Sequence, residues 1–179
     1  MRQDRGEGES TAAGNAGSGQ EKFPDFQGKD LDGKEVNSSE LFSGNTVTVV
    51  NFWFTTCKPC VGELADLDAL NQELAQKGGA VVGINAFTLD GDEGAIAEAK
   101  EILSKKGASY QNLWFDSDGD AGRFTAGLYA FPTTYVVDQN GNIVGQPIVG
   151  AVTSPEQTKA LNALIEQALV TCKRNPSPV

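Results

Sequence analysis

The chain has 179 residues, 39% of them hydrophobic, which suits a single domain with an ordinary apolar core that needs no disulfide staples. Its formal net charge of −10 argues against nucleic acid and anionic membranes as partners, because both require Lys and Arg patches to neutralise phosphate. The absence of histidine excludes Ser-His-Asp and Cys-His catalysis and every His-ligated metal site.

The N-terminal stretch, residues 2–20, is polar and rich in Gly, Ser and Ala, which predicts a flexible linker. Two origins stay open for it: a disordered tail or cloning remnant, and the tether of an exported or lipid-anchored protein whose leader has been removed. No apolar run approaches the roughly 20 residues that a membrane-spanning helix needs. We expect a linker over residues 1–21, one domain over residues 22–172 and a flexible tail over residues 173–179.

Order is predicted to begin near residues 23–26. Asp32-Gly33 is a strong turn signal, and a short strand is expected after it at residues 34–36. Residues 38–42 then read as a short capped helical turn. Residues 47–54 are β-branched, aromatic and nearly continuously apolar, as in a central strand that is buried on both faces.

A helix is predicted to start near Cys57, because Pro59 fits in a first turn, where a missing N–H costs nothing. Gly78-Gly79 should end this helix. Its apolar stripe consists of Val61, Leu64, Leu67, Leu70 and Leu74.

The middle of the chain alternates strands and helices. Residues 80–84 and 113–115 read as buried strands, and a helix capped by Asp92 should run through Lys106 between them. Its inward face would be formed by Ile96, Ala99, Ile102 and Leu103. A short helix should open at residues 118–120.

The last third predicts a hairpin and a helix. Strands at residues 133–137 and 143–149 flank Asn140-Gly141, a common two-residue hairpin turn, so their pairing should be antiparallel. Pro147 cannot donate to a ladder, which puts the last strand at an edge or a bulge. The final helix, residues 155–171, carries an apolar face of Leu161, Leu164, Ile165, Ala168 and Leu169.

This order of elements predicts an α/β fold. Strands alternating with helices imply a mostly parallel central sheet that is covered on both faces. The hairpin adds antiparallel strands, so the expected sheet is mixed: a parallel βαβ half plus an antiparallel hairpin.

The cysteines carry the chemistry. Cys57 and Cys60 form a C-x-x-C motif between a buried strand and a helix, a placement typical of a redox pair, and Cys172 is left over. At a helix N-terminus the backbone N–H groups favour the Cys57 thiolate, and Lys58 adds a nearby positive charge. Cys60, one turn further along, suits the resolving role. Two ligands of a zinc site are the alternative interpretation of this motif, but a structural zinc ion needs four ligands.

Several segments together are similar to the thioredoxin superfamily, specifically to its TlpA/ResA-like branch of extracytoplasmic thiol–disulfide oxidoreductases. The resemblance runs from about Phe23 to Leu169. It rests on Phe23-Pro24-Asp25-Phe26, Asp32-Gly33-Lys34, Val49-Val50-Asn51-Phe52-Trp53, Cys57-Lys58-Pro59-Cys60 with Glu63, and residues 131–138 (FPTTYVVD) with Asn140-Gly141.

The resemblance implies a thioredoxin-like fold, no cofactor and a reversible Cys57–Cys60 disulfide in which Cys57 is the nucleophile and Cys60 the resolver. Pro132 would be a cis-proline beside the cysteines that offers the backbone of Phe131 to an extended substrate. Trp53 would line the site. From the residues alone, a trans loop proline would be the default at position 132.

Two polar residues near the motif need separate mention. Asn51 stands where cytoplasmic thioredoxins carry a buried, proton-handling Asp, so one candidate base is missing. Glu63 is a substitute for proton transfer to Cys60, with a surface or packing position on its helix as the alternative.

The function expected from this resemblance is reduction or exchange of disulfides in exported proteins, with electrons from a membrane partner and a membrane tether through a removed leader. Reductant is the predicted direction. A peroxiredoxin-type thiol peroxidase is one alternative. It needs a Pro-x-x-x-Thr-x-x-Cys pattern, but Val50 stands here at the proline position and Phe54 at the threonine position. A metal-carrying or docking module without enzymatic activity is the other.

Overall fold

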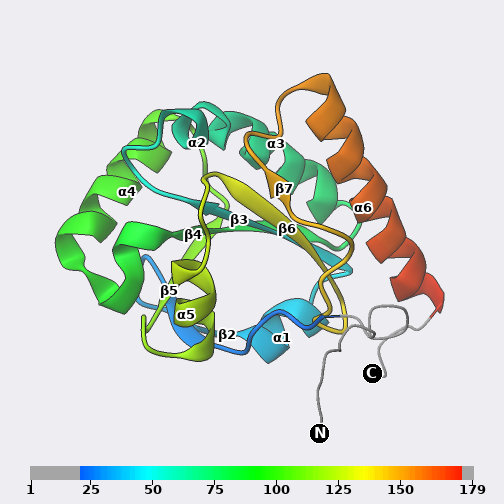
Figure 1. The fold of residues 1–179 in the computed structure, drawn as a ribbon, viewed down its shortest axis with the longest axis horizontal. Coiled ribbons are helices and arrows are strands. Elements are labelled where there is room, and N and C mark those ends of the chain that lie inside the picture. Colours follow the sequence, from blue (N-terminus) through cyan, green and yellow to red (C-terminus); the bar gives the residue numbers. More distant parts are fainter. Residues whose placement is uncertain (1–20, 175–179) are drawn as a thin grey trace, which may run out of the picture.

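The computed structural model describes residues 21–174, so residues 1–20 of the predicted linker and residues 175–179 of the predicted tail lie outside the described residues. Figure 1 shows a twisted sheet across the middle of the molecule, with helices above and below it. The strands are β1 (Gln27–Asp30), β2 (Glu35–Asn37), β3 (Val47–Trp53), β4 (Ala80–Asn85), β5 (Gln111–Phe115), β6 (Thr133–Asp138) and β7 (Ile148–Val149). The helices are α1 (Ser38–Ser43), α2 (Lys58–Gly62), α3 (Leu64–Ala75), the 3-10 helix η3 (Ala86–Gly91), α4 (Glu93–Lys105), α5 (Asp120–Ala126) and α6 (Pro155–Arg174).

The sheet has the order β2-β1-β5-β4-β3-β6-β7. β3, β4 and β5 are parallel neighbours, whereas the remaining pairings within residues 21–174 are antiparallel. The mixed sheet is therefore confirmed, but the expectation that it is mostly parallel is wrong. The difference comes from β1 and β2, which pair as a hairpin on the β5 side and add antiparallel contacts there.

Two apolar layers cover the sheet, one on each face. The first packs α3, α4 and α6 on one face through residues such as Leu67, Ala99 and Ile165. The second packs α1 and α5 on the other face and contains Phe42 and Ala121. Figure 1 shows these two groups of helices on opposite sides of the strands, as the alternating strand and helix pattern predicts.

The sequence did not predict β1. Its residues alternate between exposed and half-buried and include no β-branched side chain, so the segment lacks the usual strand signal. Gly28 is what lets it pair, because a Cβ there would lie 2.3 Å from the carbonyl oxygen of Trp114 on β5. A close backbone approach of this kind requires glycine.

The hairpin near the end of the chain is shorter than predicted. Asn140-Gly141 forms its turn, with Gly141 at a φ of 85°, and Ile143 makes an isolated bridge to Val137. Regular pairing then stops until β7, because Gly145 adopts a φ of 65° and Pro147 has no N–H to donate. β7 lies at the sheet edge, as Pro147 predicted.

The helices follow the predicted capping signals. Asp92 caps α4 by accepting from the Ala95 N–H at 2.9 Å, as expected. α1 is capped by Asn37. α6 continues to Arg174, so Lys173 and Arg174 belong to this helix, although the sequence placed them in the flexible tail. No helix among residues 21–174 is long and apolar enough to span a membrane.

Asp68 on α3 fastens the segment before β5. This residue is 6% exposed, and its carboxylate accepts from the Ser109 N–H at 2.8 Å, the Ser109 hydroxyl at 3.2 Å and the Gln72 amide at 2.9 Å. Asp68→Ala is expected to lower the free energy of unfolding by about 2 kcal/mol, because it leaves the Ser109 N–H without its charged acceptor. Urea unfolding measures this, with the exposed neighbour Asp66→Ala as the control; equal losses in both variants would contradict the prediction.

Candidate active site

The two motif cysteines lie just beyond the end of β3, where the chain turns into α2. They form a disulfide, with 5.2 Å between their Cα atoms. Cys57 is the N-cap of α2, and its sulfur accepts a hydrogen bond from the Cys60 N–H at 3.3 Å. Pro59 occupies the first turn, as predicted. The sulfur of Cys57 thus faces a backbone donor that stabilises negative charge.

Exposure separates the two cysteines. Cys57 is 7% exposed and Cys60 is fully buried, so an incoming group can reach only the first of them. Lys58 lies exposed between them in sequence. Trp53 is fully buried, and its indole N–H donates to Asn112 at 2.8 Å. It packs in the same apolar cluster as both cysteines, so it lies beneath the site rather than on its surface.

The loop before β6 carries Phe131, whose side chain packs against the apolar cluster that contains both cysteines. The peptide bond between Phe131 and Pro132 is cis. Two hydrogen bonds hold the chain where this loop enters β6. The Thr133 hydroxyl donates to the Ala130 carbonyl at 2.7 Å, and the Gly150 N–H donates to the Pro132 carbonyl at 2.8 Å. Within residues 21–174 the backbone of Phe131 makes no hydrogen bond.

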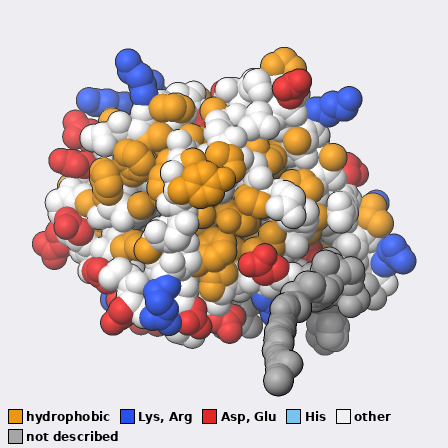
Figure 2. Space-filling model, viewed as in Figure 1, with side chains coloured by type: hydrophobic (Ala, Val, Ile, Leu, Met, Phe, Trp, Pro, Cys, Tyr) orange, Lys and Arg blue, Asp and Glu red, His pale blue; other side chains and the backbone are white. Residues whose placement is uncertain are grey.

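Aromatic side chains border the site. The ring of Phe54 lies 5.0 Å from that of Phe87 and 5.2 Å from that of Phe131, measured between centroids. Phe87 is 47% exposed and Tyr129 is 90% exposed. Figure 2 shows apolar side chains gathered across the middle of this face, over the connection between α5 and β6. Sequence reasoning did not foresee Phe54 and Phe87 as surface features of the site.

Two hydrogen bonds of the Asn85 side chain fix the loop that carries Phe54. The Asn85 amide donates to the Thr55 hydroxyl at 3.0 Å, and its oxygen accepts from the Phe87 N–H at 2.8 Å. Asn85 ends β4, the parallel neighbour of β3, so one side chain holds the loops that follow both strands. The aromatic border is therefore built on a rigid support.

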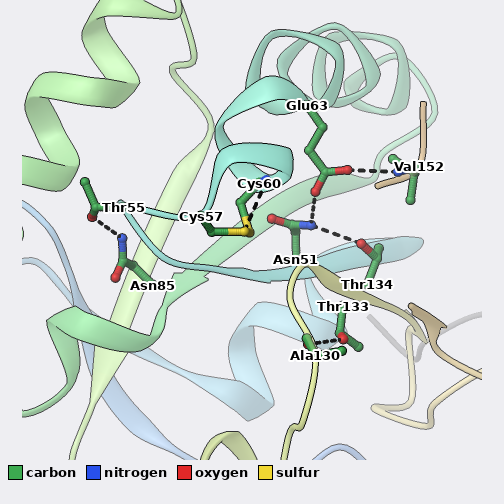
Figure 3. The surroundings of a disulfide bond; sticks show 10 residues. All are labelled: Asn51, Thr55, Cys57, Cys60, Glu63, Asn85, Ala130, Thr133, Thr134 and Val152. Carbon is green, nitrogen blue, oxygen red and sulfur yellow. Dashed lines mark hydrogen bonds between the residues drawn. A yellow bond between two sulfur atoms is a disulfide. The ribbon is translucent and has the colours of Figure 1, made fainter. Parts of the chain in front are cut away.

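Glu63 is where the structure departs most from expectation. It stands at the junction of α2 and α3 and is fully buried, so the surface position considered for it is wrong. One carboxylate oxygen accepts from the Asn51 amide at 2.9 Å, and the other accepts from the Val152 N–H at 2.9 Å. Figure 3 shows this network beside the disulfide, with Thr134 as a further acceptor for the Asn51 amide at 3.0 Å.

Burial raises the pKa of Glu63 above its usual value of 4.5, although the hydrogen bonds from Val152 and Asn51 act in the opposite direction. Asp66 raises it further through its negative charge. The periodicity of the chain carried a signal for this burial. Glu63 stands four residues before Leu67 and seven before Leu70, which is the spacing of one helix face.

The raised pKa predicts how stability depends on pH. The folded state holds the Glu63 proton more tightly than the unfolded chain, so this carboxyl stabilises the fold at low pH. The contribution is lost as pH rises from about 4.5 through the pKa of the folded state. Urea unfolding from about pH 4 to about pH 8 should therefore show a decline that Glu63→Gln removes. The exposed Glu73→Gln should keep the decline; identical pH profiles for both variants would contradict the assignment.

The chain resembles known proteins over most of its length. The AhpC/TSA family matches residues 20–146. The thiol–disulfide oxidoreductase ResA of Bacillus thuringiensis (strain Al Hakam) is 34% identical over 139 residues, which cover 76% of this chain and 69% of that protein. The thiol:disulfide interchange protein DsbE of Vibrio cholerae is 30% identical over 153 residues, 84% of this chain and 76% of that one.

The fold has solved counterparts as well. The crystal structure of a putative thiol:disulfide interchange protein DsbE from Chlorobium tepidum has a TM-score of 0.66 and 28% identity, and the match covers 84% of this chain and 96% of that one. Taken with the disulfide that follows β3 and the mixed sheet behind it, these likenesses show that the chain belongs to the AhpC/TSA family and has a thioredoxin-like fold related to the ResA and DsbE thiol–disulfide oxidoreductases.

Proposed function

We propose that this protein reduces disulfide bonds in exported proteins, with Cys57 and Cys60 alternating between dithiol and disulfide. The observation that carries the proposal is the arrangement of this pair: a disulfide beyond the end of β3 whose first sulfur faces a backbone N–H and is the more exposed of the two. Protein disulfides, which arrive on peptide segments, suit the open and apolar surface beside Cys57.

The reaction begins from the dithiol. The Cys57 thiolate attacks one sulfur of the substrate disulfide, and the other substrate sulfur leaves as a thiolate that takes up a proton. Cys60, once deprotonated, attacks the Cys57 sulfur of this mixed disulfide and displaces the second substrate thiolate. The substrate has then gained two electrons, and Cys57 and Cys60 are joined as in the structure.

The cis-proline loop and the aromatic border are proposed to hold the substrate. The backbone of Phe131 is free to pair with an extended segment, and Pro132 is proposed to lie beside the cysteines. Phe54, Phe87 and the ring of Phe131 would pack against apolar side chains of the substrate. Trp53 supports the site from beneath, and Lys58 adds a positive charge beside the reactive sulfur.

Glu63 is proposed to accept the proton that Cys60 loses before it attacks. A buried carboxyl with a raised pKa exchanges protons nearer to neutral pH than an exposed one does. The position where cytoplasmic thioredoxins carry an aspartate is occupied here by Asn51, which cannot serve as a base. Glu63 is hydrogen-bonded to this asparagine, so the buried carboxyl group lies one side chain away from the position of the thioredoxin aspartate.

The location and the electron source are proposed by analogy with the family that the chain resembles. The chain resembles ResA and DsbE proteins, and its motifs resemble the extracytoplasmic TlpA/ResA-like branch of the thioredoxin superfamily. We propose the same location, a tether to the membrane through the segment before residue 21, and a membrane protein as the donor that returns the disulfide to the dithiol.

The alternative functions have weaker support. A peroxiredoxin-type peroxidase needs a proline and a threonine seven and three residues before its cysteine. Here those positions are Val50, which is buried, and Phe54, whose ring packs on Phe87. For a metal carrier, residues 21–174 contain no cluster of three or more His, Cys, Asp or Glu side chains placed to hold an ion.

The reduction potential of the Cys57–Cys60 pair tests the proposed direction. Equilibration with dithiothreitol buffers should give a value of about −270 mV or lower, as for thioredoxin. A value of about −120 to −180 mV would instead indicate a protein that oxidises or isomerises disulfides. Failure to reduce insulin with dithiothreitol as the electron source would contradict the proposed activity altogether.

A further inference from the structure

Asn51 has an unusual place in the buried network. It lies in the middle of β3, is fully buried and points toward α2 and α3. Its amide nitrogen donates both to Glu63, at 2.9 Å, and to Thr134, at 3.0 Å. Its side-chain oxygen accepts no hydrogen bond from any residue among 21–174, although a buried amide oxygen normally has a donor.

Chemistry fixes which way this side chain points. The nitrogen of the Asn51 amide faces Glu63, which is the orientation that the ionised carboxylate requires, because that form can only accept hydrogen bonds. Glu63 is in turn held by the Val152 N–H on its other oxygen. The amide oxygen is therefore left on the opposite side, and Figure 3 shows it pointing toward the sulfur atoms of Cys57 and Cys60.

The oxidised pair has nothing to give to this oxygen. Neither sulfur of a disulfide carries a hydrogen, so the acceptor of Asn51 stays without a donor while Cys57 and Cys60 are joined. Reduction changes that, because two electrons and two protons convert the bond into two thiols. Cys57 already faces the Cys60 N–H and is the better thiolate, so the buried Cys60 is the thiol that keeps its proton.

We propose that Asn51 is a positioning residue for the resolving cysteine: in the reduced protein its side-chain oxygen accepts the S–H of Cys60. The inference rests on the proposed dithiol cycle. The bond exists in only one redox state, so it favours the dithiol and assigns the proton to Cys60 and the charge to Cys57. The proton passes to Glu63 only after this bond is broken. Asn51 thus holds the Cys60 proton in the resting dithiol, and Glu63 accepts this proton during the reaction.

The inference predicts a spectroscopic signature. In a chain with Cys57→Ser and Cys172→Ser, Cys60 is the only thiol, and its infrared S–H stretch reports directly on a hydrogen bond. We expect a band shifted to lower frequency than that of a free thiol. Adding Asn51→Leu, which replaces the polar atoms by methyl groups of similar branching, should move the band to the free-thiol position. An unmoved band would overturn the inference.

Thr134→Val is the matched control. It removes the other acceptor of the same amide and is equally buried, but it leaves the oxygen of Asn51 in place. The S–H band should stay shifted in this variant; movement as large as in Asn51→Leu would show a general packing effect and overturn the inference. If Asn51→Leu does not fold, Asn51→Asp keeps the shape and still offers an oxygen to Cys60, so its band must remain shifted.

An equilibrium measurement tests the same bond in the chain with all its cysteines. With dithiothreitol as reductant, Asn51→Leu should shift the equilibrium toward the disulfide by about fivefold, the usual size of one net hydrogen bond. Thr134→Val should shift it much less. If insulin reduction fails while the S–H band responds as expected, the proposed function is wrong and the inference stands. If reduction proceeds and the band does not respond, only the inference is wrong.

Discussion

Cys57→Ser is expected to lower the rate of insulin reduction by at least about a thousandfold, because a serine hydroxyl does not ionise near neutral pH and cannot attack a disulfide. The geometry predicts that nothing replaces it, since Cys60 is fully buried and Cys172 lies on α6, away from the motif. Turbidity from precipitating insulin, with dithiothreitol as the electron source, measures the rate.

Cys60→Ser separates the two halves of the same reaction. The Cys57 thiolate can still attack, but nothing displaces the substrate, so a stable mixed disulfide should accumulate and be visible by mass spectrometry. Cys172→Ser is the control and should reduce insulin at the normal rate, because that thiol sits beside Gln139, at 3.1 Å. If the Cys57→Ser variant kept full activity, Cys57 could not be the nucleophile.

Glu63→Gln is expected to slow release of the substrate from the mixed disulfide by about a hundredfold, the usual contribution of one positioned proton acceptor. The first attack, made by Cys57, should keep its rate. Because burial raises the pKa of Glu63, the release step in the unaltered chain should become faster as pH rises through that pKa. The variant should lack this dependence. Rapid mixing with a small aromatic disulfide, followed by absorbance of the released thiol, separates the two steps.

Asp66→Asn controls for charge alone. This carboxylate is exposed, stands three residues further along and acts on Glu63 only through its charge. Removing it should leave the release step close to normal. An equal slowing by both variants would mean that the net charge of α3 matters and that Glu63 does not take the proton.

The buried strands were the predictable part of the fold. β3, β4 and β6 consist mostly of apolar or β-branched residues and lie in the interior of the sheet, where sequence pattern and burial agree. β1 and the interrupted strand before β7 could not be predicted, for opposite reasons. β1 pairs through its backbone with weak side-chain preference, while residues 143–149 have strand-like side chains on a backbone that Gly145 and Pro147 divert.

The site was predictable as far as its sulfur chemistry. The C-x-x-C spacing and the strand before it were enough to place Cys57 at a helix start and Cys60 inside. The polar network was not predicted, because a charged residue on a helix is exposed far more often than buried, and this general preference outweighed the spacing of Glu63. Asn51 in the centre of an apolar strand was the visible sign that another polar group had to meet it.

The way the chain enters and leaves the domain has a consequence for attachment. The Phe23 N–H binds the Gly141 carbonyl, and Cys172 near the end of α6 contacts Gln139, so both described ends meet the turn after β6. That turn adjoins the start of β3, whereas the disulfide follows its end. The length of β3 separates the two by about 20 Å, and Figure 1 shows the end of α6 on the side of the molecule away from α2. A domain held at either end on a flat support, whether a bilayer or a sensor chip, would turn its reactive sulfur outward to the medium.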